Sequence, residues 1–159
     1  MDSARTCHAE ASIDLPLDPQ TAWDVVMDWD RQSRWMLFTR VWATENDGVG
    51  VGGGVAARTS VGALGFTDDM VITHWDPPRE CTVKHLGTVV RGTGTFAVTP
   101  GRWGVEGPAE GAGTSTFTWS EDAVPPLGKL GVALWPLVRT VLEVMMRVSL
   151  RRLVREVAR

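Results

Sequence analysis

Most of the chain alternates between apolar and polar positions with a period of two, which predicts β-strands. Residues 7–15 alternate weakly and end at Pro16, so we expect a first strand followed by a break. Six further strands are predicted, at 38–44, 55–63, 67–75, 80–86, 92–99 and 114–120. Separators rich in Gly, Pro and Asp lie between most of them, the longest at 100–113. Successive antiparallel hairpins are the simplest arrangement of such strands.

A helix is predicted directly after the first strand. Asp18 supplies an N-cap acceptor before Pro19, which suits the first helical position because its missing N–H has no partner there. An apolar stripe at helical spacing follows, formed by Ala22, Trp23, Val25, Val26 and Trp29. Residues 30–35 form either a short polar turn or a second helix.

The end of the chain changes to a helical period and predicts one long helix over 136–158. Its apolar face is formed by Val138, Leu142, Met145, Met146, Ser149 and Leu153. Glu143, Arg147 and Arg151 lie opposite. Pro136 is expected either to begin this helix or to kink it.

This order of elements predicts an α+β protein in which the long helix covers one face of a twisted antiparallel sheet. Where helix and sheet diverge, an apolar gap is expected, and gaps of that kind bind small ligands. The 159 residues, 43% of them hydrophobic and 22% charged, fit a single domain over 1–159.

Charge excludes some partners. The formal net charge is −3, so the chain lacks the basic surface that nucleic acids need. Residues 139–159 hold six Arg and two Glu, which is typical of a helix C-terminus and leaves transient membrane contact as the alternative. The most apolar stretch, 130–150, is interrupted by charges, so no transmembrane segment is predicted. Two cysteines and a start without a signal-peptide pattern predict a cytoplasmic protein.

Several short motifs occur in a fixed order along nearly the whole chain. They are Leu15-Pro16, Asp18-Pro19-Gln20-Thr21-Ala22-Trp23-Asp24, Asp28-Trp29-Asp30 with Trp35, the glycine run before Val55, residues 71–79, Gly113-Thr114 before Phe117-Thr118-Trp119, and Leu150-Arg151-Arg152-Leu153. In these motifs the chain resembles the SRPBCC or START-like superfamily, specifically its polyketide cyclase/dehydrase and lipid-transport branch. The resemblance implies a helix-grip fold, a curved antiparallel sheet wrapped around the C-terminal helix with a hydrophobic cavity between them.

Eight tryptophans are the unusual compositional feature. Each buries a large ring and keeps one N–H donor, which suits the wall of a cavity. The residues expected to line the cavity are Trp35, Phe38, Phe66, Trp75, Phe96, Trp119, Met145 and Ser149. The Ser149 hydroxyl either contacts a ligand head group or bonds back to the preceding helical turn.

Few residues are candidates for a catalytic role. A cyclase or dehydratase needs a base beside the substrate carbonyl and a cation or donor for the enolate. His85 is the candidate base because apolar Val83 shares its strand face, and Arg58 is the candidate cation. His74 depends on the register of its strand, because one register turns Trp75 inward and the opposite one turns His74 inward.

No cofactor or metal site is predicted. Cys81 and His85 share a strand face, but a zinc site needs three or four ligands. The glycine run at 48–54 precedes a strand and not a helix, so we expect a hairpin loop at the cavity mouth and no phosphate loop.

Three hypotheses follow. The first is a carrier or sensor that binds a small hydrophobic or amphiphilic ligand, such as a lipid, a quinone or a polyketide-like compound. The second is a polyketide cyclase or dehydratase that uses His85 and Arg58, and the third is an interaction-only module with a filled core. The protein is expected to be a monomer or a homodimer.

Overall fold

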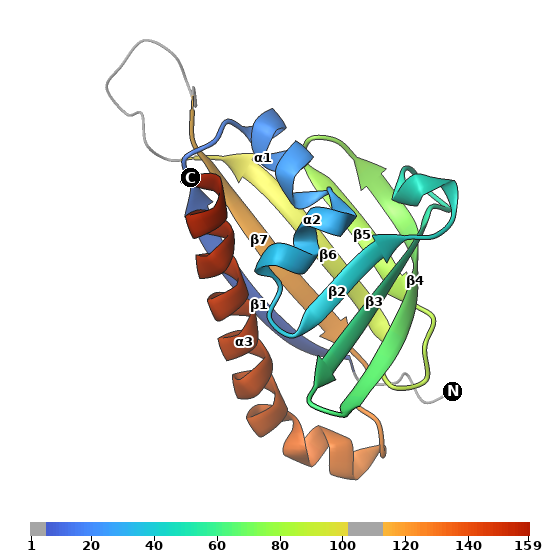
Figure 1. Ribbon diagram of the computed structural model, residues 1–159. Helices are drawn as coiled ribbons and strands as arrows, with labels where there is room; N and C mark the ends of the chain where they lie inside the picture. Colours follow the sequence, from blue (N-terminus) through green and yellow to red (C-terminus); the bar gives the residue numbers. More distant parts are fainter. Residues whose placement is uncertain (1–5, 102–112) are drawn as a thin grey trace.

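The computed structural model describes residues 6–101 and 113–159 of the chain (Figure 1). Its strands are β1 (Cys7–Leu15), β2 (Thr39–Ala43), β3 (Gly54–Val61), β4 (Leu64–Asp76), β5 (Glu80–His85), β6 (Gly92–Pro100) and β7 (Ser115–Ala123). Its helices are α1 (Pro19–Val26), α2 (Trp29–Trp35) and α3 (Lys129–Val157), with a 3-10 turn, η1, at Asn46–Gly48. Every predicted strand is therefore confirmed. Most of the loop expected at 100–113 lies outside the described residues.

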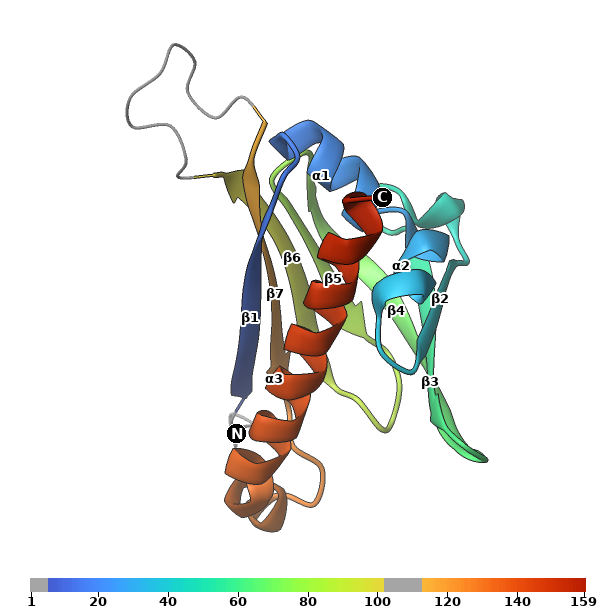
Figure 2. The same cartoon turned by 60° about the vertical axis from the view of Figure 1, so that its left-hand side comes forward.

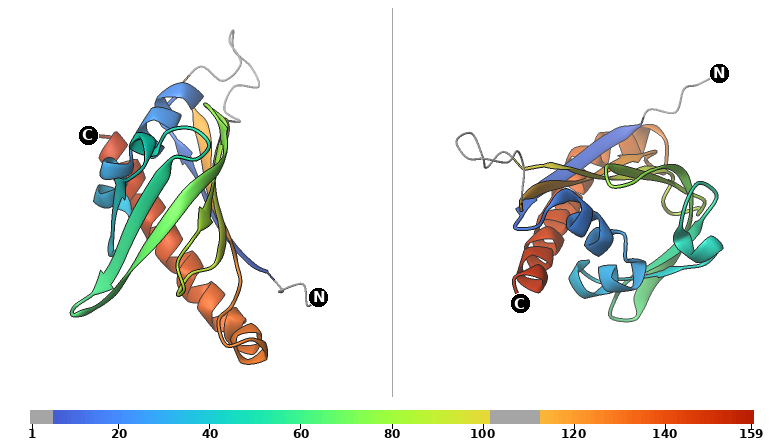
Figure 3. Two further views of the ribbon diagram at one scale, coloured as in Figure 1. Left: turned by 90° about the vertical axis from the view of Figure 1, so that its right-hand side faces the viewer. Right: turned by 90° about the horizontal axis from the view of Figure 1, so that it is seen from above.

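The strands form one sheet in the order β1-β7-β6-β5-β4-β3-β2, and every neighbouring pair is antiparallel. Figure 2 shows α3 lying along the concave face near β1 and β7, and the view from above in Figure 3 shows the sheet curling around that face. The α+β class and the helix-grip arrangement are confirmed.

The two short helices are fixed by aspartate caps, as the sequence predicts for the first. The Asp18 side chain accepts hydrogen bonds from the backbone N–H groups of Gln20 and Thr21, both at 3.1 Å. Asp28 accepts one from the Arg31 N–H at 3.0 Å and begins α2, so the segment after α1 is a helix and not a polar turn.

A β-bulge decides the register of β4. Ile72 pairs with Val83 on β5, but His74 pairs with Thr82, so one residue of β4 is left over between them. Ile72 and Trp75 therefore both pack inside, whereas His74 is exposed. Neither of the two uniform registers expected from the sequence holds along the whole strand.

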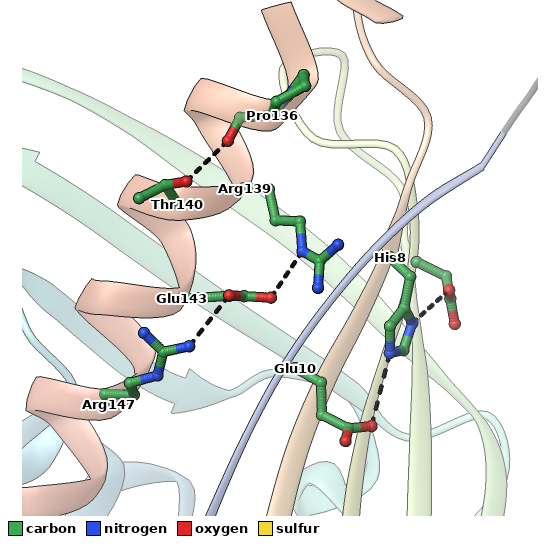
Figure 4. Close-up of polar contacts among 8 residues, drawn as sticks. His8, Glu10, Pro136, Arg139, Thr140, Glu143 and Arg147 are labelled. Atoms are coloured by element: carbon green, nitrogen blue, oxygen red, sulfur yellow. Dashed lines mark hydrogen bonds and ion pairs between the residues drawn. The ribbon is translucent and has the colours of Figure 1, made fainter.

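Helix α3 begins at Lys129, seven residues before the predicted start, and Pro136 lies inside it. Figure 1 shows the helix bending along its first half. Its buried residues, Met146, Ser149, Leu150 and Leu153, all lie in its second half. Arg139 and Arg147 both bond to Glu143 on the face turned toward β1 (Figure 4).

The loop between β2 and β3 is held to α2 by one hydrogen bond. Trp29 Nε1 donates to the Gly48 carbonyl at 2.8 Å, and Gly48 has a φ of +65°. A Cβ at this position would collide with the Trp29 ring. Glycine is therefore required here both for the backbone conformation and for the close approach of the ring.

We expect Gly48→Ala to lower the free energy of unfolding by about 2 kcal/mol or more, because it adds strain and displaces the Trp29 hydrogen bond. Gly50→Ala is the matched control, since Gly50 has a φ of +75° with no atom near its absent Cβ. It should cost only about 1 kcal/mol. Equal losses in urea denaturation would contradict the role given to the Trp29 contact.

Candidate functional site

A cavity of about 690 Å³ lies between the concave face of the sheet and residues 135–149 of α3. Its wall is mainly apolar and comes from α2, from β2 to β7, from the loops after β5 and β7, and from α3. Because this space is open, the hypothesis of an interaction-only module with a filled core does not fit the structure.

Five of the eight predicted ligand-binding residues line the cavity: Phe66, Phe96, Trp119, Met145 and Ser149. Ser149 is held by a contact that the sequence did not predict. Its Oγ accepts a hydrogen bond from the Leu37 N–H at 2.9 Å, which ties α3 to the connection between α2 and β2. It is buried, and it contributes to the cavity wall from this fixed position.

The other three predicted residues lie elsewhere. Trp35 is completely buried one layer deeper, where its ring packs edge-on against Trp119 with 6.4 Å between centroids. Trp75 packs against Trp23 of α1, with centroids 5.3 Å apart. Phe38 is 50% exposed at a positive φ of 59°. Trp35 thus supports the cavity wall without touching the open space.

The cavity wall carries one buried cluster of ionisable side chains. His85 Nδ1 bonds to Asp68 Oδ2 at 2.5 Å, and His85 Nε2 bonds to Glu121 Oε2 at 3.0 Å. Trp119 Nε1 donates to the other Glu121 oxygen at 2.8 Å. All four residues line the cavity, and the side chains of His85 and Asp68 are only 7% and 8% exposed.

Gly94 on β6 makes room for this cluster, whose side chains come from β4, β5 and β7. His85 lies on β5 and Glu121 on β7, so the Glu121 side chain must cross β6 to reach the imidazole. It does so over Gly94, where a Cβ would come within 2.9 Å of Glu121 Oε1. The missing side chain provides the space that the carboxylate fills.

The cluster holds a proton on His85. Burial is the largest influence on the pKa of the imidazole and lowers it, because the charged ring loses water. The hydrogen bonds and charges of Asp68 and Glu121 act in the opposite direction and together raise the pKa from 6.5 to about 9. The ring is therefore a cation at neutral pH, and each of its nitrogens already contacts a carboxylate.

The predicted cation, Arg58, is not in this cavity. Its side chain is exposed, whereas its neighbours Ala57 and Thr59 line the cavity from the other face of β3. The arginine in the cavity wall is Arg91, from the loop after β5. His85 and Arg58 are thus not brought together.

Other candidate chemistry is limited. Within residues 6–101 and 113–159, no group of three or more His, Cys, Asp or Glu side chains is placed to hold a metal ion. Cys81 faces the same way as His85, but burial raises the pKa of its thiol to about 12. The glycine run at 48–54 forms the expected hairpin loop, but none of its residues lines the cavity. No helix in the described part of the chain is long and apolar enough to span a bilayer.

Over residues 6–158, the sequence matches the family described as polyketide cyclase/dehydrase and lipid transport. The chain belongs to this family. It is also similar to uncharacterized proteins of Mycobacterium tuberculosis, at 30% identity over 80 residues and 49% of this chain. The chain spans about half the length, 55%, of these relatives.

Solved structures of similar fold include an aromatase/cyclase. The Zhui aromatase/cyclase from a Streptomyces species has a TM-score of 0.70 and 17% identity, with 95% of this chain and 93% of that chain covered. A protein from Thermus thermophilus has a TM-score of 0.69 and 14% identity, with 96% and 97% covered. At these identities the likeness is one of fold, and it agrees with the helix-grip arrangement of this family member.

The two partners of His85 were not predicted from the sequence. Asp68 lies among alternating polar residues of β4 and Glu121 follows Trp119 by two, and neither spacing distinguishes it from a solvated strand residue. The one available signal was Gly94 in the interior of a predicted strand, because such a glycine marks a close approach by another group.

Stability should fall as pH rises from about 6.5 to 9. The folded-state pKa of His85, about 9, lies above the unfolded value of 6.5, so the stabilisation is complete below pH 6.5 and is lost as pH passes through 9. The loss should approach about 3 kcal/mol in urea denaturation. A flat profile would contradict the cluster.

Two variants provide the controls for this profile. His74→Gln removes an exposed imidazole that does not contact the cluster, and it gives the background against which the effect of the cluster is measured. Gly94→Ala displaces Glu121, so it should lower the pKa of His85 in an NMR titration and flatten the profile.

Proposed function

We propose that this protein binds one small, mainly apolar molecule in its cavity as a carrier or sensor, and that a hydroxyl group of this molecule lies at the His85 cluster. The observation that carries the proposal is the composition of the cavity wall, which is mainly apolar and carries one buried cluster of ionisable side chains around His85. Such a wall favours a ligand that loses little water on binding and is oriented by one polar contact.

The size of the cavity supports this ligand class. A volume of about 690 Å³ falls within the range of sites that enclose drug-sized molecules. Phe66, Phe96 and Trp119 provide flat apolar surface, and Met145 has the flexibility to adjust to ligands of different shape. A lipid, a quinone or a polyketide-like ring system fits these requirements of size and apolar surface, and a lipid or ring system that bears a hydroxyl group also meets the polar requirement.

The polar cluster supports a donor on the ligand. His85 and Trp119 both direct their N–H groups at carboxylates, so their donors are already used. Asp68 Oδ1 is buried and has no hydrogen-bond partner within the described residues. A carboxylate in that position is best satisfied by an O–H group.

A cyclase or dehydratase is the second candidate, because the same cluster places ionisable groups at the cavity wall. A protonated His85 serves as an acid and not as the base predicted from the sequence. Arg58 lies outside the cavity, so the predicted pair of base and cation is not formed, although Arg91 lines the wall. Because the predicted base is already protonated at neutral pH, the arrangement favours binding over turnover.

Ligand binding is tested with two phenylalanine variants. Phe66→Ala removes apolar surface from the cavity wall and should weaken binding about tenfold, whereas Phe38→Ala removes a ring that does not line the cavity and should have little effect. Tryptophan fluorescence on titration with fatty acids, quinones and polycyclic phenols measures the affinity. Native mass spectrometry checks for a one-to-one adduct, and its absence across the panel would contradict the proposal.

Turnover is tested separately with Asp68→Asn. If the protein is an enzyme, this variant should still bind an aromatic polyketide precursor but lose most of its conversion, since the His85 acid loses its charged partner. Product is followed by liquid chromatography. Unchanged precursor with the parent protein, despite saturable binding, would favour the carrier or sensor.

A further inference from the structure

One end of the molecule exposes an apolar rim around the cavity. It comprises the β3–β4 hairpin tip, the loop after β5, the loop after β7 and the first half of α3, which lie at the same end in Figures 1 and 2. Its exposed residues are Val61, Leu64, Leu86, Val89, Leu127, Leu130, Leu134, Leu137, Val138 and Val141. Leu64 and Leu127 are the most exposed of them, at 82% and 76%. Single exposed leucines are common, but so many exposed apolar residues at one end of a protein indicate an interaction surface.

The rim is continuous with the cavity. Val89, Leu137, Val138 and Val141 are exposed and also line the cavity. The apolar surface therefore runs without interruption from the outside of the molecule to the interior space.

The segments that form the rim, together with the neighbouring strand β2, carry cations and no carboxylates. Segments 37–44, 55–67, 86–92 and 123–142 contain no Asp or Glu, although the whole chain has 19. They contain exposed Arg40, Arg58, Arg91 and Lys129, none of which forms an ion pair with another described residue. Arg139 is neutralised by Glu143. Arg58, the cation that the sequence suggested for the cavity, lies on β3 three residues before Val61 at the hairpin tip.

We propose that the apolar rim docks on an anionic lipid bilayer. Exposed leucines and valines enter the boundary between head groups and acyl chains, and the surrounding cations contact anionic head groups. A second copy of this chain suits the surface less well, because a symmetric interface would bring the same uncompensated cations together. The proposal concerns the outer surface and does not depend on what the cavity binds.

Vesicle flotation tests the docking. The parent protein should float with vesicles of phosphatidylcholine containing roughly one third phosphatidylglycerol, and much less with phosphatidylcholine alone. Leu64→Gln with Leu127→Gln should weaken binding about tenfold or more. Arg58→Gln with Lys129→Gln should weaken it about fivefold for each charge on the anionic vesicles.

The matched control is Val49→Gln with Val51→Gln, which changes two exposed valines in the β2–β3 loop at the opposite end of β3. It should float like the parent. The proposal is overturned if the parent floats with neither vesicle, or if the Leu64 and Leu127 variant floats as well as the parent. It is also overturned if sedimentation shows a dimer that this variant converts to a monomer, since a second copy would then cover the rim.

Discussion

One helix cannot cover the concave face of a seven-stranded sheet, and most of the features described above follow from that mismatch. A helix is about 10 Å wide, whereas seven strands about 4.8 Å apart span roughly 29 Å. Curling the sheet reduces the difference, and α1 and α2 close one end (Figure 3). The second half of α3 packs on the sheet beside these two helices, and its first half continues to the other end, where it borders the open space (Figure 1). The cavity is the part of the apolar face that no element covers.

An apolar cavity wall makes any charge on it costly, so the ionisable groups it contains must compensate one another. His85 keeps its proton only because Asp68 and Glu121 both contact its ring, and Glu121 does so only because Gly94 leaves room above β6. The chemistry of the site therefore depends on a residue with no functional group. The same compensation occupies both imidazole nitrogens, which makes His85 better suited to holding a ligand-binding carboxylate in place than to removing a proton from a substrate.

The fold was predictable because its signals are local. Alternation, turn residues and the Asp18 cap each act within a few positions, and every predicted strand is present. The site was less predictable because it depends on register and on pairing across strands. A single extra residue between Ile72 and His74 turns both Ile72 and Trp75 inward, and no pattern in the strand shows where the bulge lies. Apart from Phe38, which is half exposed, the aromatic residues predicted for the cavity do lie in the interior. Trp35 and Trp75, however, lie behind the cavity wall, and periodicity does not show how deep a buried residue lies.

The two ends of the cavity differ in polarity. Apolar rim residues from the hairpin tip, two loops and α3 surround its mouth, and the polar cluster lies inside, on the strands. A ligand can enter with its hydroxyl group toward the strands and its apolar part against the rim. In this orientation its apolar part contacts apolar side chains and its hydroxyl group reaches the polar cluster. The bent first half of α3 borders this route and exposes leucines and valines on the side away from the Glu143 ion pairs. The mismatch between helix and sheet thus creates the space and also leaves exposed the surface through which the space is reached.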